Sequence, residues 1–526
     1  MIVNDTPYDV WSVVSTYLPS RDVEKLCGVS RQLRPVGLDA RFREVKFSRH
    51  DSKMKRLCEM LGRDEVAIRV RRLTIEPWLV QPRTKTYVSK SENLWNRVNT
   101  FFNPKYMEEE AQKRVEKRIN KDIRRVTGAV KRLENIHDYQ ILYDERSTSY
   151  HRQLVGAFLS PALEAFGSKL ISLTIKVPFE FLQHLSYVRL PQLRSFNIYL
   201  CTGDASMEQV QYSLDGFFVF IHNLRDLEHL GISATSSSRD LDLSYFSNRW
   251  GVFPRLKSFA LSIPFNGGLL SSPEDFYRHV MEPHARTLEK LKLSTTHSGP
   301  SRYKLPPDCH LWIRRILKSS FDAEFPRLRE VELALRPLKA ELTDLHTFLG
   351  RRAPILEKLT LTDRALNDAE LVELFQALCP SEEYHTGQNT VLGSLKIKVA
   401  VLSPQLLLLV AQKFPRLKSL CLTFADVAGD AQNSKQTGFD PQLKLVSSLY
   451  LGIFHCCSTL LTTHKELFEQ ALQRPYTVLV LDTWCLRNLD LANSSPTYPW
   501  VYALKQIFLR NFPSTLNVGE LPLPTN

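Results

Sequence analysis

The feature that most constrains the fold is a short apolar pattern that recurs along the chain. The hexapeptide FPRLKS occurs at Phe253–Ser258 and at Phe414–Ser419, and FPRLRE stands between them at Phe325–Glu330. The proline in each copy lacks an N–H group and ends any helix that runs into it. Each copy then continues as Leu-x-x-φ-x-φ, where φ is apolar, and the last two apolar residues share one face of a β-strand. The hexapeptide therefore predicts a junction between a helix and a strand.

The Leu-x-x-φ-x-φ pattern, called the comb below, also recurs without the full hexapeptide. The first residues of successive combs lie 23 to 40 residues apart. Such self-similarity indicates stacked strand-containing units that are each too small to bury an apolar face alone. Segments between the combs, such as Asp368–Leu378, show the periodicity of amphipathic helices. The well-formed combs begin at Leu170, Leu193, Leu227, Leu256, Leu288, Leu328, Leu356, Leu392 and Leu417, and weaker copies begin at Val446, Tyr476 and Leu504.

A strand and a helix in each unit resemble the leucine-rich-repeat family, over roughly residues 168–511. The resemblance implies an α/β fold, an irregular solenoid with a curved parallel sheet and helices on its convex side. The family usually has Asn or Cys three residues after the last apolar strand position. Cys201 fits this rule, whereas Pro178, Thr235 and Ala400 do not. We therefore expect an uneven arc rather than a uniform horseshoe.

The first fifty residues predict a set of compact helices. Thr6 is a suitable N-cap, Pro7 suits the first helical position, and Pro19 ends the first helix. The segment resembles an F-box, with Thr6 where that family usually has Leu. Pro35 is a second departure, and we expect it to shorten or kink the third helix. The matching positions are Pro7, Tyr17-Leu18, Asp22-Val23, Leu26 and Val29-Ser30-Arg31.

An F-box followed by leucine-rich repeats resembles the substrate receptors of SCF ubiquitin ligases, in a divergent form common in filamentous fungi. The resemblance implies that the F-box docks on the Skp adaptor and through it on a cullin, while the repeats hold a protein substrate. The receptor itself performs no bond chemistry and needs no cofactor. One alternative is a binding scaffold with a degenerate F-box, and another is a hydrolase or transferase with an unrecognised site. The implied adaptor contacts are Pro7, Val10, Val14, Leu18, Val23, Leu26 and Val29.

These patterns predict four segments: an F-box at 1–50, a helical connecting region with possible first repeat strands at 51–167, repeats at 168–511 and a tail at 512–526. The net charge is +13, and residues 1–150 hold 30 Lys and Arg against 21 Asp and Glu, or +9. A basic region is one mark of nucleic-acid binding. Here the charges lie along a long amphipathic helix near 106–133, with no interleaved aromatic residues for base stacking. We expect no nucleic-acid partner.

The composition also favours an intracellular protein. Nine cysteines without a CxxC pair resemble neither a disulfide framework nor a zinc site. The N-terminus is acidic where a signal peptide is basic. The most apolar stretch, Val399–Ala411, is interrupted by polar residues and is too short to cross a bilayer. We expect reduced thiols, no membrane association, and a cytoplasmic or nuclear location.

Motifs of catalysis are missing from the sequence. It has no Gly-rich phosphate loop, GxSxG, HExxH or kinase signature set. His455, Cys456, Cys457 and His464 are close enough in sequence to suggest metal ligands, but adjacent cysteines in an apolar segment favour burial. Asp240 and Asp242 lie in a predicted serine-rich loop, and we expect their carboxylates to be solvated. We expect a protein that is not an enzyme and holds no metal.

The repeats predict a charged strand face opposite the apolar one. Lys290 and Lys292, Glu330 and Glu332, Lys358, and Lys396 and Lys398 all alternate with apolar strand positions. Opposite charges on neighbouring strands can pair with one another, or they can contact a substrate. The candidates for substrate contact are Lys292, Lys358, Lys396 and Lys398. Lys396 and Lys398 are preferred because the next comb offers Ser419 and Cys421 instead of acids, and an acidic or phosphorylated segment is the expected ligand.

Overall fold

The computed structural model is an α/β protein that divides into two compact units. The first comprises Met1–Leu241 with Arg249–Leu256, and the second comprises Asp242–Asn248 with Lys257–Asn526. The described residues are 7–48, 51–76, 106–143, 150–202, 206–234, 241–244, 247–296, 308–338, 341–379, 391–427, 469, 485–493 and 517–518.

The first unit starts with three helices, α1 (Tyr8–Ser15), α2 (Ser20–Lys25) and α3 (Leu33–Phe42), with a 3-10 turn at Leu26–Gly28 after α2. The expected effect of Pro35 is not seen, since α3 runs for ten residues. Pro35 lies in the first turn of α3, where backbone N–H groups have no partner within the helix and a proline removes nothing.

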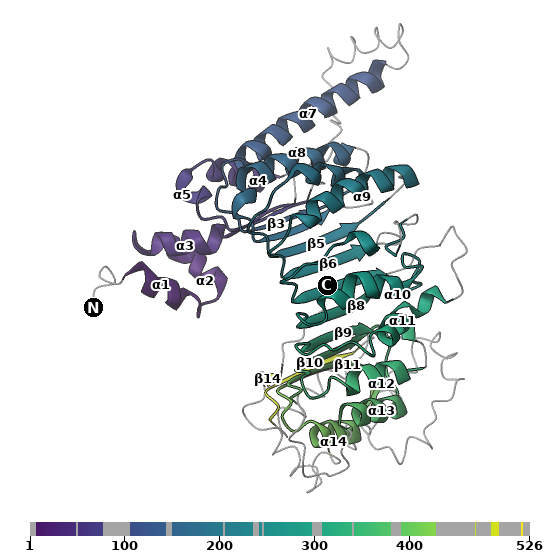
Figure 1. Ribbon diagram of the computed structural model, residues 1–526. Helices are drawn as coiled ribbons and strands as arrows, with labels where there is room; N and C mark the ends of the chain where they lie inside the picture. Colours follow the sequence, from purple (N-terminus) through teal and green to yellow (C-terminus); the bar gives the residue numbers. More distant parts are fainter. Residues whose placement is uncertain are drawn as a thin grey trace, which may run out of the picture. The chain divides into compact units, whose positions relative to one another are not determined.

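Parallel strands follow the three helices in the first unit. Each strand pairs with the next one along the chain. The helices between them lie along one side of the strands, as Figure 1 shows for α4, α8 and α9. The strands are β1 (Glu44–Phe47), β2 (Arg72–Ile75), β3 (Asp138–Leu142), β4 (Ser172–Lys176), β5 (Ser195–Leu200) and β6 (His229–Ala234), and the main intervening helices are α4 (Ser52–Leu61), α5 (Asp64–Ala67), α7 (Tyr106–Val130), α8 (Tyr150–Phe166), the 3-10 helix η5 (Phe179–Tyr187) and α9 (Met207–His222).

The second unit repeats the same plan with strands that again pair in parallel and in chain order. Helices α10 to α14 lie beside these strands in Figure 1. The strands are β7 (Ser258–Pro264), β8 (Lys290–Thr296), β9 (Glu330–Ala334), β10 (Lys358–Thr362), β11 (Ser394–Leu402), β12 (Ser419–Val427), β13 (Asn488–Asn493) and β14 (Asn517–Val518), and the α-helices are α10 (Pro273–Phe276), α11 (Trp312–Ser319), α12 (Thr343–Gly350), α13 (Asp368–Leu378) and α14 (Pro404–Lys413).

The strand register aligns the combs. Leu291 pairs with Val331, Val331 with Leu359, and Leu359 with Leu395, so that one apolar position continues from strand to strand. These side chains are buried, as are their counterparts two residues later. Each strand thus contributes one row of apolar residues to a core beneath the helices, an arrangement compatible with an open solenoid.

A repeated backbone contact joins successive described combs within each unit. The carbonyl oxygen of Lys257 accepts hydrogen bonds from the N–H groups of Glu289 and Lys290, at 2.7 and 2.9 Å. The carbonyl oxygen of Arg329 likewise accepts hydrogen bonds from the N–H groups of Glu357 and Lys358, at 2.8 and 2.9 Å. Equivalent forks start at Arg43, Arg71, His137, Ile171 and Arg194 in the first unit, and at Glu289, Glu357, Gly393 and Lys418 in the second.

The FPRL segments form tight turns at the ends of the connecting segments. In all three the N–H of the leucine donates to the carbonyl of the phenylalanine, at 3.1 to 3.3 Å, with proline at the second turn position. Phe253, Phe325 and Phe414 are buried. The arginines at 255, 327 and 416, two residues after each phenylalanine, are exposed.

Arg352 of the second unit stabilises the segment that leads into the Phe325 turn. Its guanidinium donates to the carbonyls of Phe348, Ser320 and Ala323, at 2.9, 3.1 and 3.2 Å. It also lies over the rings of Phe348 and Phe325, 4.0 and 5.0 Å from their centroids. Burial lowers the pKa of Arg352 to about 10, so the group is still charged at neutral pH.

Strands also occur before residue 168, and β2 and β3 lie in the connecting region 51–167, where possible first repeat strands are predicted. β1 precedes them and lies inside the segment assigned to the F-box. Their combs open with Phe42, Val70 and Ile136 instead of leucine. Near the C-terminus, β13 carries a further comb at Leu486, Leu489 and Leu491. The weaker combs predicted at Val446, Tyr476 and Leu504 lie outside the described residues.

Gly216 offers a test of the packing between α9 and η5. A Cβ atom there would lie 2.9 Å from the Cα of Gln183 and 3.2 Å from its carbonyl oxygen. We therefore expect Gly216→Ala to lower the free energy of unfolding by about 1–3 kcal/mol, because backbone must move to admit the methyl group. Urea unfolding followed by circular dichroism measures this.

The matched control is Gly128→Ala in α7, where an added Cβ meets nothing within 4 Å. That change should stabilise the chain by up to about 1 kcal/mol, because alanine is the better helix former. Equal responses at the two glycines would contradict the close approach of α9 to η5.

Candidate interaction surfaces

Helix α1 exposes an apolar surface. None of its eight residues is buried. Val10, Val13 and Tyr17, which follows the helix, are 47%, 58% and 83% exposed. Tyr8, Val14 and Leu18 are exposed as well. A cluster of large apolar side chains on one short segment is typical of a surface that binds another molecule.

The exposed helix is held by contacts that centre on Asp39 of α3. The Tyr8 hydroxyl donates to one carboxylate oxygen of Asp39, and Arg69 Nη1 donates to the other at 2.6 Å. Arg69 also donates to the carbonyl of Pro35 at 3.1 Å. The hydrogen bond to Asp39, with burial second, raises the pKa of Tyr8. Charged and polar contacts thus position α1 and leave its apolar residues outside.

The predicted adaptor contacts are not all on this surface. Pro7, Val10, Val14, Leu18 and Val29 are exposed, and Leu26 is half-buried. Val23 is only 3% exposed and belongs to the core of the three-helix segment, so it is not available for contact as predicted. Tyr8, Val13 and Tyr17 are exposed contributors that the motif comparison did not include, although the apolar run in the sequence contains all three.

Most charges on the strand face of the second unit pair across strands. Lys290 and Glu330 lie 2.7 Å apart, and Lys292 and Glu332 lie 2.8 Å apart. Lys358 lies 3.9 Å from the second carboxylate oxygen of Glu330. Of the two alternatives, cross-strand pairing and substrate contact, Lys292 and Lys358 therefore follow the first. The face of the first unit follows the same rule, since Arg72 bridges Glu44 and Asp138.

Lys396 and Lys398 on β11 have different neighbours. Lys396 is in register with Thr360 of β10 and Cys421 of β12, and Lys398 is in register with Thr423. Lys396 is exposed and Lys398 half-buried. Neither lysine forms an ion pair with a carboxylate among the residues that the structure describes. Their charges are therefore available to a ligand.

Cys421 lies between the lysines and an acid. Its Sγ donates to the Asp490 carboxylate at 3.5 Å. Burial raises the pKa of Cys421 to about 11; Asp490 adds to the rise and Lys396 opposes it. The thiol is consequently protonated and neutral near pH 7.

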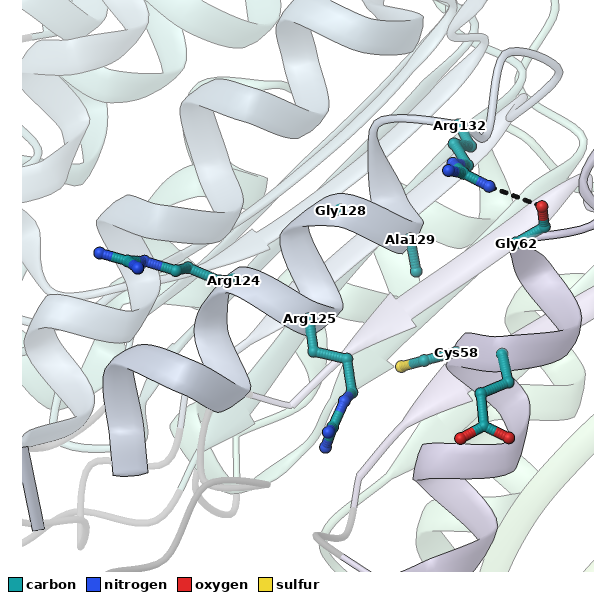
Figure 2. Close-up of a pocket in the computed structure, with 8 residues that line it drawn as sticks. Cys58, Gly62, Arg124, Arg125, Gly128, Ala129 and Arg132 are labelled. Atoms are coloured by element: carbon teal, nitrogen blue, oxygen red, sulfur yellow. Dashed lines mark hydrogen bonds between the residues drawn. The ribbon is translucent and has the colours of Figure 1, made fainter. Parts of the chain in front are cut away.

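A cleft of about 350 Å³ lies between α4 and α7 in the first unit (Figure 2). Two of its arginines already have partners. Arg132 donates to the carbonyl of Gly62 at 2.6 Å, and Arg125 lies 3.5 Å from Asp122. Arg124 points away from Cys58 in Figure 2. The remaining lining residues are Cys58, Glu59, Gly62, Gly128 and Ala129.

The chemistry of this cleft does not favour nucleophilic catalysis. Burial raises the pKa of Cys58 to about 11, so its thiol is protonated at neutral pH. No histidine lines the cleft to act as its base. The cleft therefore lies at the junction of α4 and α7 without an activated nucleophile among its lining residues.

The other candidate groups give no metal site in the described part of the chain, where no cluster of three or more His, Cys, Asp or Glu could hold an ion. His455, Cys456, Cys457, His464 and Asp240 lie outside the described residues. Asp242 accepts hydrogen bonds from the N–H groups of Ser244 and Ser271, which is a loop-stabilising role.

Within the same described residues, none of the helices combines the length and apolar character needed to cross a bilayer.

Comparison with known proteins assigns no family to the chain. It matches no family model and no curated protein sequence. Among solved structures it is similar to a crystal structure of a TLR13–ssRNA13 complex, with 13% identity and a TM-score of 0.23. The match covers 57% of this chain and 44% of the other. A likeness this weak does not bear on fold or function.

The strand face can be tested through the reactivity of Cys421. We expect Asp490→Asn to lower the pKa of the thiol and to speed its alkylation at pH 9, because the variant removes a nearby negative charge. Lys396→Gln should slow alkylation, because it removes the opposing positive charge. Iodoacetamide labelling followed by peptide mass spectrometry measures the rate at this residue. Shifts in the same direction for both variants would refute the assigned arrangement.

Proposed function

We propose that this chain is the substrate-recognition subunit of an SCF-type ubiquitin ligase. In this proposal α1 to α3 form an F-box that docks the Skp adaptor, and the strand–helix units are leucine-rich repeats that bind a protein substrate. The chain is then not an enzyme itself, and it works in the cytoplasm or nucleus. The observation that carries the proposal is the exposed apolar surface of α1, on a segment with F-box spacing.

The apolar surface supports docking because its exposure is costly without a partner. Burial of apolar surface contributes about 25 cal/mol of favourable free energy per Å². Several valine, leucine and tyrosine side chains that become buried on docking would therefore contribute substantially to binding. The polar contacts of Asp39 hold α1 in place before any partner arrives. A preorganised surface loses less entropy on binding.

The proposed contribution to catalysis is geometric. A receptor that holds a substrate close to a ubiquitin-charged enzyme raises the effective concentration of substrate lysines at the thioester. Such a receptor needs two separate surfaces and no catalytic group. Exposed apolar residues on α1 and the polar strand face of the second unit supply two surfaces of different chemistry.

A second candidate is a binding scaffold that has no ligase partner. The buried position of Val23, where the motif comparison placed a contact, favours this alternative because it reduces the adaptor surface. Affinity purification of the full chain from its source cells separates the two. Adaptor and cullin in one eluate support the ligase, whereas adaptor without cullin, or neither, supports the scaffold.

The adaptor surface itself is tested with the double variant Val14→Asp and Leu18→Asp. These side chains are 39% and 41% exposed, so the change should leave the fold intact. We expect adaptor affinity to fall at least about a hundredfold, because two charges would be buried in an apolar interface. Isothermal titration calorimetry with purified adaptor measures the affinity, and circular dichroism checks the fold.

The matched control replaces Val219 and Val372 by Asp. They lie on α9 and α13 and are 53% and 42% exposed, outside the proposed docking surface. Adaptor affinity should remain at the wild-type value in this control. If both double variants lose binding equally, or neither does, α1 is not the docking surface.

A further inference from the structure

We infer that Lys396 and Lys398 form the docking site for an extended protein segment that carries Asp or Glu at alternate positions. The inference deepens the proposed function, on which it rests, by naming the chemical class of the substrate segment. Three features of the second unit lead to it: the spacing of the lysines, the charge of the neighbouring strands, and the neutral groups around them.

The spacing follows from the strand geometry of β11. Lys396 and Lys398 are two residues apart on one strand and alternate with buried Leu395, Ile397 and Val399. Successive residues on one face of a strand lie roughly 7 Å apart along its axis. Alternate side chains of an extended ligand segment repeat at the same distance. Two carboxylates spaced by one residue therefore match the two lysines.

The neighbouring strands provide an internal comparison. Lys290 and Lys292 of β8 have the same spacing and the same strand face, but Glu330 and Glu332 neutralise them at 2.7 and 2.8 Å. The strands beside Lys396 present Thr360 and Cys421 instead of acids. The lysine pair on β8 is thus neutralised by acids on β9, whereas the lysine pair on β11 keeps its positive charge. We assign the charge on β11 to the binding of a ligand.

The surrounding groups define the kind of ligand. Ser394, Ser419 and Thr423 lie beside the lysines and have small, half-buried hydroxyl side chains. These residues supply hydrogen-bond donors for carboxylates, but none has an aromatic face for stacking a nucleic-acid base. An acidic protein segment therefore fits this face better than a single-stranded nucleic acid.

Acids lie in the same row on both sides of Lys396, each two strands away. Asp490 of β13 lies in the same row, one strand beyond Cys421. Its negative charge would repel an acidic segment from β13. Glu332 of β9 lies in the same row on the other side, one strand beyond Thr360, and pairs with Lys292. The segment is consequently expected along β11.

The lysines also favour carboxylates over a phosphate group. A phosphate is held best by several donors that converge on one point, as arginine forks provide. Lys396 and Lys398 are separate point charges at successive positions of one strand face. Two single carboxylates match this distribution more closely than one doubly charged group.

The test uses the full chain and a short fluorescein-labelled peptide in which Glu and Ser alternate. Fluorescence anisotropy measures the affinity of the wild type and of the double variant Lys396→Gln and Lys398→Gln. We expect the double variant to bind about tenfold more weakly, which corresponds to two part-exposed ion pairs. A peptide of the same composition with its glutamates in adjacent pairs should bind the wild type more weakly than the alternating peptide.

The matched control is the double variant Lys290→Gln and Lys292→Gln. It removes the same net charge from the same strand face, so it reports any general electrostatic effect. The alternating peptide should bind this control with less than about a twofold loss. Equal losses in the two double variants would overturn the inference, since attraction to the overall charge would then explain the binding.

Three further outcomes would overturn it. They are tight binding of a singly phosphorylated peptide without binding of the alternating one, binding of single-stranded oligothymidylate that is lost in the Lys396 and Lys398 variant, and no detectable peptide binding by the wild type. Adaptor affinity is measured on the same preparations. If the wild type binds the adaptor but not the alternating peptide, only the lysine site is refuted. If the wild type does not bind the adaptor, the proposed function is refuted.

Discussion

The forked backbone contact between successive combs is the constraint on which the rest of the structure depends. Within each unit, the residue before a strand gives its carbonyl oxygen to two consecutive N–H groups at the start of the following strand, for example from Lys257 to Glu289 and Lys290. This contact sets the register at the start of the strands that it joins. Since side chains alternate along a strand, one residue of slippage would turn the apolar row outward. The fork therefore decides which residues face the helices and which face outward.

The fixed register gives the outward face its chemistry. Lys290 and Lys292 meet Glu330 and Glu332 because their strands start at equivalent positions. The same register places Thr360 and Cys421 beside Lys396, and so leaves a positive charge between two neutral side chains. Backbone contacts at one end of each strand thus determine where charge is cancelled and where it is retained.

Individual side chains stabilise loops in the second unit. Arg352 satisfies three backbone carbonyls near the Phe325 turn while it packs on two aromatic rings. At the end of β10, Asp363 adopts a left-handed backbone conformation with φ of 73°, and its carboxylate accepts a hydrogen bond from Thr295 of β8. These loops are therefore stabilised by different side chains rather than by one repeated residue type.

The sequence by itself determined the strand rows, because a buried position in a parallel sheet demands an apolar residue and the Leu-x-x-φ-x-φ spacing records it. The buried strand positions, such as Leu291, Val331 and Leu359, follow from that spacing. Strands β1 to β3 carry the same signal, but Phe42, Val70 and Ile136 replace leucine and hide it from a leucine-based search. Only the tertiary structure decided that Val23 is buried while Val13 and Tyr17 are exposed. The reason is that an amphipathic helix shows which residues are apolar, whereas its packing partners decide which of them remain in contact with solvent.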